Sequence, residues 1–158
     1  MYFKIIKRTT IKELEDFEEI KKIRKYKIEI AGEKWKMYEE NVLKEIEKGI
    51  LNAQYNQVAK KFKNMSDEEI HDIIYFNIAD RTESLSVYGF TQYMFRKTGN
   101  TVWLSLSVSI MAYVLCRMEG AYAVGIFHAR ELVSLEKNID NLILLLSFYG
   151  LPEHLMDA

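Results

Sequence analysis

The stretch that decides the fold is VWLSLSVSIMAYVLC, residues 102–116. It contains no charged residue, and its serines are interleaved with apolar residues. A bilayer span needs roughly 20 residues, so this shorter segment is expected to form a helix buried on most of its circumference. Two more helices are expected after it, over residues 119–135 and 142–148, before a stop at Gly150-Leu151-Pro152. These three helices are predicted to form the core.

The composition is that of a folded, helical protein. Of the 158 residues, 49% are hydrophobic and 13% aromatic, which argues against disorder and for a single domain over residues 1–158. One proline and seven scattered glycines disfavour an all-β sandwich, which needs many turns. The single cysteine, Cys116, excludes a disulfide within the chain and favours a reducing cytoplasm. The first residues, MYFKIIKR, lack the apolar run of a signal peptide, so none is expected.

The charge is unevenly distributed along the chain. Residues 1–64 hold 16 Lys/Arg against 11 Asp/Glu, a net charge of +5, whereas residues 65–158 hold 6 against 12, a net charge of −6. This asymmetry fits a basic tract and an acidic face that bind different partners. It equally fits amphipathic surface helices whose solvated faces happen to use lysine, and the sequence leaves both interpretations open.

Upstream of residue 102, apolar residues at helical spacing predict further helices. One is expected over residues 11–28, after a capping box at Thr10-Ile11-Lys12-Glu13 and before a break at Ala31-Gly32. A second is expected to begin near Trp35 and either to end at Gly49 or to continue to Lys63.

The clearest helix start is Ser66-Asp67-Glu68-Glu69, where a serine N-cap precedes acids in the first turn. This helix is expected to reach Ala79, with a turn at Asp80-Arg81-Thr82, and the next is expected over residues 83–97, with Gly99 as its C-cap. Seven or eight helices joined by short connectors result, and short connectors make sequential helices antiparallel neighbours. The predicted fold class is therefore all-α, built of stacked antiparallel helical hairpins.

No arrangement of residues indicates an active site. The three histidines, His71, His128 and His154, are far apart, and none has the spacing of a metal ligand set. His71 has Asp67 and Asp72 nearby in sequence, so an acid–imidazole pair and a solvated helix pair are both open. His128 is expected to be partly buried and bonded to a neighbouring carbonyl or acid. We therefore expect no catalytic residue, no metal and no cofactor.

Other polar residues also have structural interpretations. The serines at 105, 107 and 109 lack the glycines of a nucleophile elbow, so their hydroxyls are expected to bond back to helix carbonyls. The run Lys60-Lys61-Phe62-Lys63 either contacts a phosphate or offsets the dipole at a helix C-terminus. Ten tyrosines are more than a core needs, and tyrosines beside acids are typical of a protein-binding face. Core packing with the hydroxyls at the rim is the alternative.

A set of spaced residues in the C-terminal third resembles a known bacterial family. They are Glu119-Gly120-Ala121, His128-Ala129-Arg130-Glu131-Leu132, Leu135, Leu144-Leu145, Phe148 and Pro152-Glu153. The pattern is similar to that of helical, tetratricopeptide-like immunity proteins encoded beside the toxins of contact-dependent inhibition and related polymorphic-toxin systems. The likeness covers about 35 of the 158 residues. It departs from the family at the turn after Leu135, where Lys137 replaces the usual proline.

The resemblance implies a tetratricopeptide-like stack and a cytoplasmic immunity protein that is not an enzyme. Its partner would be a cognate toxin domain, often a nuclease in these systems, which it would neutralise by occlusion. No nucleic-acid partner and no membrane partner are expected. The alternatives are a helical-repeat adaptor that binds a peptide or regulator in its groove, and a small enzyme or nucleic-acid-binding helical domain.

The charge pattern, independently of the resemblance, suggests where such a toxin would bind. A nuclease that grips phosphate tends to be basic, so we expect an acidic, tyrosine-bearing face to steer and hold it. The residues assigned to this face are Asp67, Glu68, Asp72, Asp80, Glu83 and Tyr88. Charge reversal at Asp80 and Glu83 is expected to weaken toxin binding in a titration, and an unchanged affinity would contradict the assignment.

Overall fold

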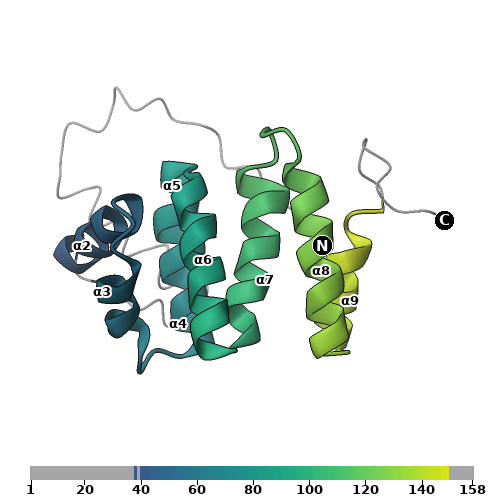
Figure 1. Cartoon of the computed structure of the whole chain (residues 1–158), viewed down its shortest axis with the longest axis horizontal. Coiled ribbons are helices and arrows are strands. Elements are labelled where there is room, and N and C mark those ends of the chain that lie inside the picture. The colour runs from purple at the N-terminus through teal and green to yellow at the C-terminus, as the bar shows by residue number, and fades with distance from the viewer. Residues whose placement is uncertain (1–37, 39, 150–158) are drawn as a thin grey trace, which may run out of the picture. The chain divides into compact units, whose positions relative to one another are not determined.

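The computed structural model describes residues 38 and 40–149, and within these residues every regular element is helical (Figure 1). The elements are α2 (Glu40–Leu51), α3 (Tyr55–Ala59), the 3-10 turn η2 (Lys60–Phe62), α4 (Asp67–His71), the π-helical segment η3 (Asp72–Ala79), α5 (Asp80–Thr82), α6 (Leu85–Thr98), α7 (Thr101–Ser109), the π-helical segment η4 (Ile110–Val114), α8 (Ala121–Leu135) and α9 (Ile139–Leu146). The all-α fold class is confirmed. The helix expected over residues 11–28, the break at Ala31-Gly32 and the stop at Gly150-Leu151-Pro152 lie outside the described residues.

Three long helices stand side by side in chain order, α6, α7 and α8, and α9 packs against α8 (Figure 1). The stretch 102–116 forms α7 and η4, as expected, and α7 occupies the middle of this row. Its start is fixed by Asn100, whose Oδ1 accepts the amide of Val102 at 3.0 Å. The described residues all belong to one compact unit.

The core beneath these helices is built on an aromatic cluster, which we define as Phe62, Phe90 and Trp103. All three side chains are buried, and the Trp103 ring centroid lies 5.3 Å from that of Phe62 and 5.7 Å from that of Phe90. Both pairs are close to edge-on, the arrangement that the ring quadrupoles favour. The cluster joins η2, α6 and α7, so these three elements pack as one.

A buried hydroxyl pair also ties α6 to α7. Ser107 Oγ donates to the carbonyl of Trp103 at 2.9 Å, which confirms the expected back-bond for this serine. The same oxygen lies 2.7 Å from Thr91 Oγ1 and accepts from Gln92 Nε2 at 2.8 Å. Thr91 and Ser107 are fully buried, so their mutual contact satisfies polar groups that water does not reach.

The helix that begins at Asp67 confirms one prediction and corrects another. The capping box is present, because Ser66 Oγ accepts the amide of Glu69 at 3.2 Å and Glu69 Oε2 accepts the amide of Ser66 at 2.9 Å. The turn expected at Asp80-Arg81-Thr82 is wrong, because these residues continue the helix as α5. Thr82 Oγ1 donates back to the carbonyl of Ile78 at 2.8 Å, and Arg81 pairs with Glu47 of α2. The chain turns one residue later, at Glu83, where φ is 45°.

Neither expected course of the second helix is correct. α2 runs through Gly49 and ends at Leu51, and the chain reverses at Ala53, where φ is 55°, before α3 begins. Gly49 is fully enclosed because Val58 of α3 packs onto it, and a Cβ at this position would overlap Val58 Cγ2. The glycine therefore serves the close approach of α2 and α3 and does not end the helix.

Replacing Gly49 with alanine is expected to destabilise the protein by about 1 kcal/mol, because overpacking costs about 1–3 kcal/mol and outweighs the gain in helix propensity of about 1 kcal/mol. Urea denaturation of the wild type and the variant would measure this difference. In a Val58→Ala background the same substitution should become neutral or stabilising, since the overlapping methyl group is gone. A Gly49→Ala protein more stable than the wild type would contradict the close packing of Val58 onto Gly49.

α9 begins earlier than expected, at Ile139 and not at Leu142, because Asn138 provides an N-cap by accepting the amide of Asn141 at 2.8 Å. Its apolar residues do not all face inward: Ile139, Ile143 and Leu146 are 72%, 60% and 61% exposed. Within the described part of the chain, no helix combines the length and apolar character that a membrane crossing requires.

Candidate functional site

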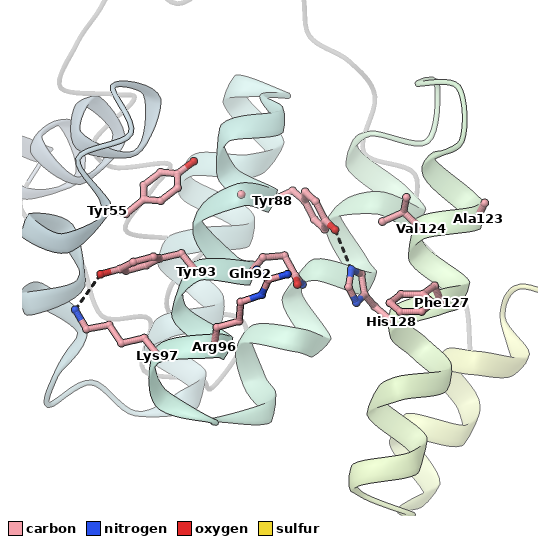
Figure 2. A pocket seen from close by; sticks show the side chains of 11 residues that line it. Tyr55, Tyr88, Gln92, Tyr93, Arg96, Lys97, Ala123, Val124, Phe127 and His128 are labelled. Carbon is pink, nitrogen blue, oxygen red and sulfur yellow. Dashed lines mark hydrogen bonds between the residues drawn. The ribbon is translucent and has the colours of Figure 1, made fainter.

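The candidate site is a groove of about 1010 Å³ that crosses α3, α6 and α8 (Figure 2). Its lining residues are Tyr55, Tyr88, Gly89, Gln92, Tyr93, Arg96, Lys97, Ala123, Val124, Phe127 and His128. α7, which connects α6 to α8 in the chain, contributes no lining residue. Alternate helices of the row therefore face the groove, and the helix between them forms the core behind it.

The floor of the groove is one face of α6. The lining residues of this helix are three neighbouring pairs at four-residue steps, 88–89, 92–93 and 96–97. Four residues are close to one helical turn, so the three pairs lie above one another on one face. The buried residues of this helix, Val87, Phe90, Thr91 and Met94, lie on the other side. α8 repeats the pattern with 123–124 and 127–128, which form the opposite wall.

One end of the groove is closed by Tyr55 of α3. Its hydroxyl donates to the carbonyl of Ser86 at 2.9 Å, and its ring lies 5.6 Å from that of Tyr93. Gly89 makes this possible, because a Cβ there would lie 2.8 Å from the Tyr55 hydroxyl oxygen. Burial raises the pKa of Tyr55 above its ordinary value, so the hydroxyl stays protonated and remains a donor.

The opposite wall is joined to the floor by a hydrogen-bonded chain of Tyr88, His128 and Glu131. The Tyr88 hydroxyl lies 2.8 Å from His128 Nε2, and His128 Nδ1 lies 3.1 Å from Glu131 Oε2. These distances fit the tautomer with its proton on Nδ1, so that Glu131 accepts from the ring and Tyr88 donates to it. Burial raises the pKa of Tyr88, an effect that Glu131 reinforces and Arg96 opposes. The predicted bond of His128 to a neighbouring carbonyl or acid is confirmed with Glu131, but the side chain is buried and not only partly so.

Two cations lie together on the floor of the groove. Arg96 is exposed and makes no hydrogen bond or ion pair with any described residue. Lys97 Nζ donates to Asn56 Oδ1 at 2.9 Å and to the Tyr93 hydroxyl at 3.0 Å, and it lies 5.2 Å from the Tyr93 ring centroid. Within the described residues the groove lining contains no aspartate or glutamate. The site is therefore aromatic and positively charged.

The acids assigned to a binding face from sequence lie elsewhere. Asp67, Glu68 and Asp72 occupy the start of the continuous helix formed by α4, η3 and α5, and Asp80 and Glu83 lie at or just beyond its end. At 1.5 Å per residue Asp67 and Asp80 are about 20 Å apart, and Asp72 and Asp80, the nearest members of the two groups, about 12 Å. Glu83 borders a small pocket of about 190 Å³. The structure thus brings together three of the acids at one end of this helix and two at the other.

Tyr88 is the one member of that set that lies in the groove, on α6 and apart from the acids. Asp67 has a structural partner, because its Oδ1 accepts from Asn100 Nδ2 at 2.8 Å. This bond links the start of α4 to the N-cap of α7.

His71 and the basic run have surroundings that favour their structural interpretations. The His71 ring stacks on Tyr75 with centroids 5.3 Å apart. Phe62 of the basic run is buried in the aromatic cluster, and Lys61 Nζ pairs with Glu45 Oε2 at 2.8 Å. Among the described residues, no three His, Cys, Asp or Glu side chains lie close enough to hold a metal ion.

His71 is expected to make stability depend on pH. Burial lowers its pKa below the ordinary 6.5, and this effect outweighs the opposite influence of Asp72. The unfolded chain therefore takes up a proton first, so His71 favours the folded state above pH 6.5 and this contribution is lost as the pH falls through its lower folded pKa. Urea midpoints at pH 7.5 and 5.5 should differ less in a His71→Gln variant than in the wild type. An NMR titration giving His71 a pKa of 6.5 or above would contradict this.

No family model, curated protein or solved structure matches the chain. The sequence did not identify Gly89, Gln92, Arg96, Lys97, Ala123, Val124 and Phe127 as groove residues. The signal that could have found them is the repeat of neighbouring pairs at four-residue steps, which α6 and α8 share.

Proposed function

We propose that this chain is a non-catalytic immunity protein, which binds and neutralises a toxin domain of a contact-dependent inhibition or related system, and that the groove is where the toxin docks. The open, aromatic groove is the observation that carries the proposal. Tyrosine, phenylalanine and arginine are enriched at the energetic centres of protein interfaces, and here Phe127 is 64% exposed at the groove wall. The ring stands beside Ala123 and Val124 in the same lining, and exposed apolar surface that lines a groove is typical of a protein-binding site.

The residues that carry the resemblance support the same proposal, because several of them position α8. Gly120 adopts a φ of 77° immediately before the helix, and Ala129 and Leu132 are buried along it. Phe148 packs against Gly125, where a Cβ would lie 3.0 Å from the ring. His128 holds the groove wall through Tyr88. The pattern thus maintains the wall of the groove, and a tetratricopeptide-like stack of helix pairs is the arrangement we propose for it.

Co-expression tests the proposal directly. The partner is the C-terminal domain encoded by the reading frame immediately upstream, expressed from an inducible promoter with and without this chain. Restored growth, together with co-purification of a stoichiometric complex, is the expected result. A toxic domain that this chain neither relieves nor binds would refute the immunity role.

A helical-repeat adaptor is the second candidate function, because the groove is long enough along α6 to hold an extended peptide. Three successive pairs of lining residues on α6 span about 14 Å between Tyr88 and Lys97, their first and last members. An adaptor would bind a segment of a partner that is not toxic, so absence of toxicity from the neighbouring reading frame would favour it.

A further inference from the structure

We propose that the segment entering the groove is acidic: a carboxylate of the partner binds Arg96 and Lys97, while an adjacent apolar side chain lies against Phe127. This inference rests on the proposed use of the groove for binding, but it does not depend on whether the partner is a toxin. It reverses the charge expected from the sequence, since the groove offers cations to its ligand and the acids lie elsewhere.

The hydrogen-bonding capacity left in the groove selects the ligand's chemistry. The hydroxyls of Tyr55 and Tyr88 are engaged with Ser86 and His128. Gln92 Nε2 is committed to Ser107 behind the groove. The tyrosine hydroxyls and one Gln92 N–H therefore already have partners within the protein.

The charged donors of the groove, Arg96 and Lys97, have no acidic partner among the described residues. The Arg96 guanidinium has no hydrogen-bond or ion-pair partner among the described residues, and Lys97 has two neutral oxygens as partners and no acid. A ligand that satisfies these groups accepts hydrogen bonds, and a negatively charged acceptor does so more strongly than a neutral one. A carboxylate matches a guanidinium in two parallel hydrogen bonds, which are stronger and more directional than bonds between neutral groups.

The charge of the surrounding chain strengthens the preference of the groove for a negatively charged ligand. Residues 65–158 have a net charge of −6, yet both cations of α6 that lie in its last turns face the groove. An acidic segment is repelled by most of this part of the chain and attracted at the groove. Both effects favour binding in one place and one orientation.

A peptide fits the groove better than a nucleic acid does. A nucleic-acid strand needs cations along its whole path to contact successive phosphates. The α8 wall instead presents Ala123, Val124 and Phe127, which contribute apolar surface beside a single cationic end. Figure 2 shows this division, with Lys97 and Arg96 on α6 and the apolar side chains on the facing helix.

Three fluorescent decapeptides would test the proposal by anisotropy on the full chain. Six positions are the same in all three peptides and are occupied by leucine and tyrosine in alternation. The four positions between them are all Glu, all Gln or all Lys. The Glu peptide is expected to bind at least about tenfold more tightly than the Gln peptide, and the Lys peptide more weakly than either. A ten-nucleotide single-stranded RNA serves as the anionic competitor.

Two double variants test whether the preference for the Glu peptide arises at the groove. Arg96→Glu/Lys97→Glu should lose the preference for the Glu peptide by at least tenfold and gain one for the Lys peptide. Arg117→Glu/Lys137→Glu changes the same net charge at two exposed cations outside the groove lining and should leave the preference intact. Unchanged thermal midpoints and circular dichroism spectra would show that both variants fold.

Equal binding of the Glu and Gln peptides, binding of none of the three, or a preference that survives Arg96→Glu/Lys97→Glu would each overturn the proposal. RNA that binds more tightly than the Glu peptide and is lost in the same variant would overturn it in favour of a nucleic-acid site. Growth rescue by the wild-type chain is scored separately. Rescue with no peptide preference would leave the immunity role standing while removing the acidic segment.

Discussion

Replacing Trp103 with alanine is expected to lower the free energy of unfolding by about 3–5 kcal/mol, the range for removing a large aromatic side chain from a packed core. The indole is 1% exposed and lies against both other members of the aromatic cluster. Its loss would leave a cavity between η2, α6 and α7, and rigid helices close such cavities only in part.

Urea denaturation monitored by far-ultraviolet circular dichroism would measure the change. Trp103→Phe is the matched milder variant, which keeps an aromatic ring in the cluster and should cost less than the alanine substitution. Because Phe90 of the cluster packs against Tyr55, which in turn contacts Tyr93, the alanine variant should also weaken partner binding. A loss of stability below about 1 kcal/mol would contradict the packing of α7 as the centre of the core.

Replacing Phe127 with alanine is expected to affect partner binding strongly and the free energy of unfolding very little. The side chain is 64% exposed, so the free energy of unfolding should change by no more than about 0.5 kcal/mol. Binding of the partner should weaken by about 2 kcal/mol or more, roughly thirtyfold in dissociation constant, if this ring is the anchor that the groove presents.

Isothermal titration calorimetry with the co-purified partner would measure this loss. Phe76→Ala is the matched control, because Phe76 is 52% exposed on η3 and lies outside the groove lining. The control variant should bind as the wild type does. Equal losses in the two variants would mean that the effect of Phe127 is not specific to the groove, and no loss in Phe127→Ala would place the docking surface elsewhere.

Features of the fold that depend on local chemistry were predictable from the sequence. Ser66 as an N-cap and Gly99 as a left-handed C-cap with a φ of 70° both follow from interactions within a few residues of the helix end. The break between α2 and α3 was not predictable in this way. Gly49 resembles a helix stop in sequence, but its role comes from Val58, which reaches it only after the chain has reversed.

The candidate site was harder to predict than the fold. Arg96 and Lys97 also suit the C-terminal turn of a helix, where cations offset the dipole, so their sequence position does not reveal a binding role. The exposure of Phe127 depends on which face of α8 the neighbouring helices leave open. The acids after residue 65 were visible in the composition. Their separation into two groups, one at each end of a single helix, depends on how far that helix extends.

The chain of Tyr88, His128 and Glu131 has a consequence for the kinetics of recognition. It spans α6 and α8 without passing through α7, so the floor and the wall of the groove are held at a set separation before any partner arrives. A preorganised site spends little conformational entropy on binding, and its association rates vary little between related ligands. Discrimination between partner segments should therefore lie in how long each one stays bound.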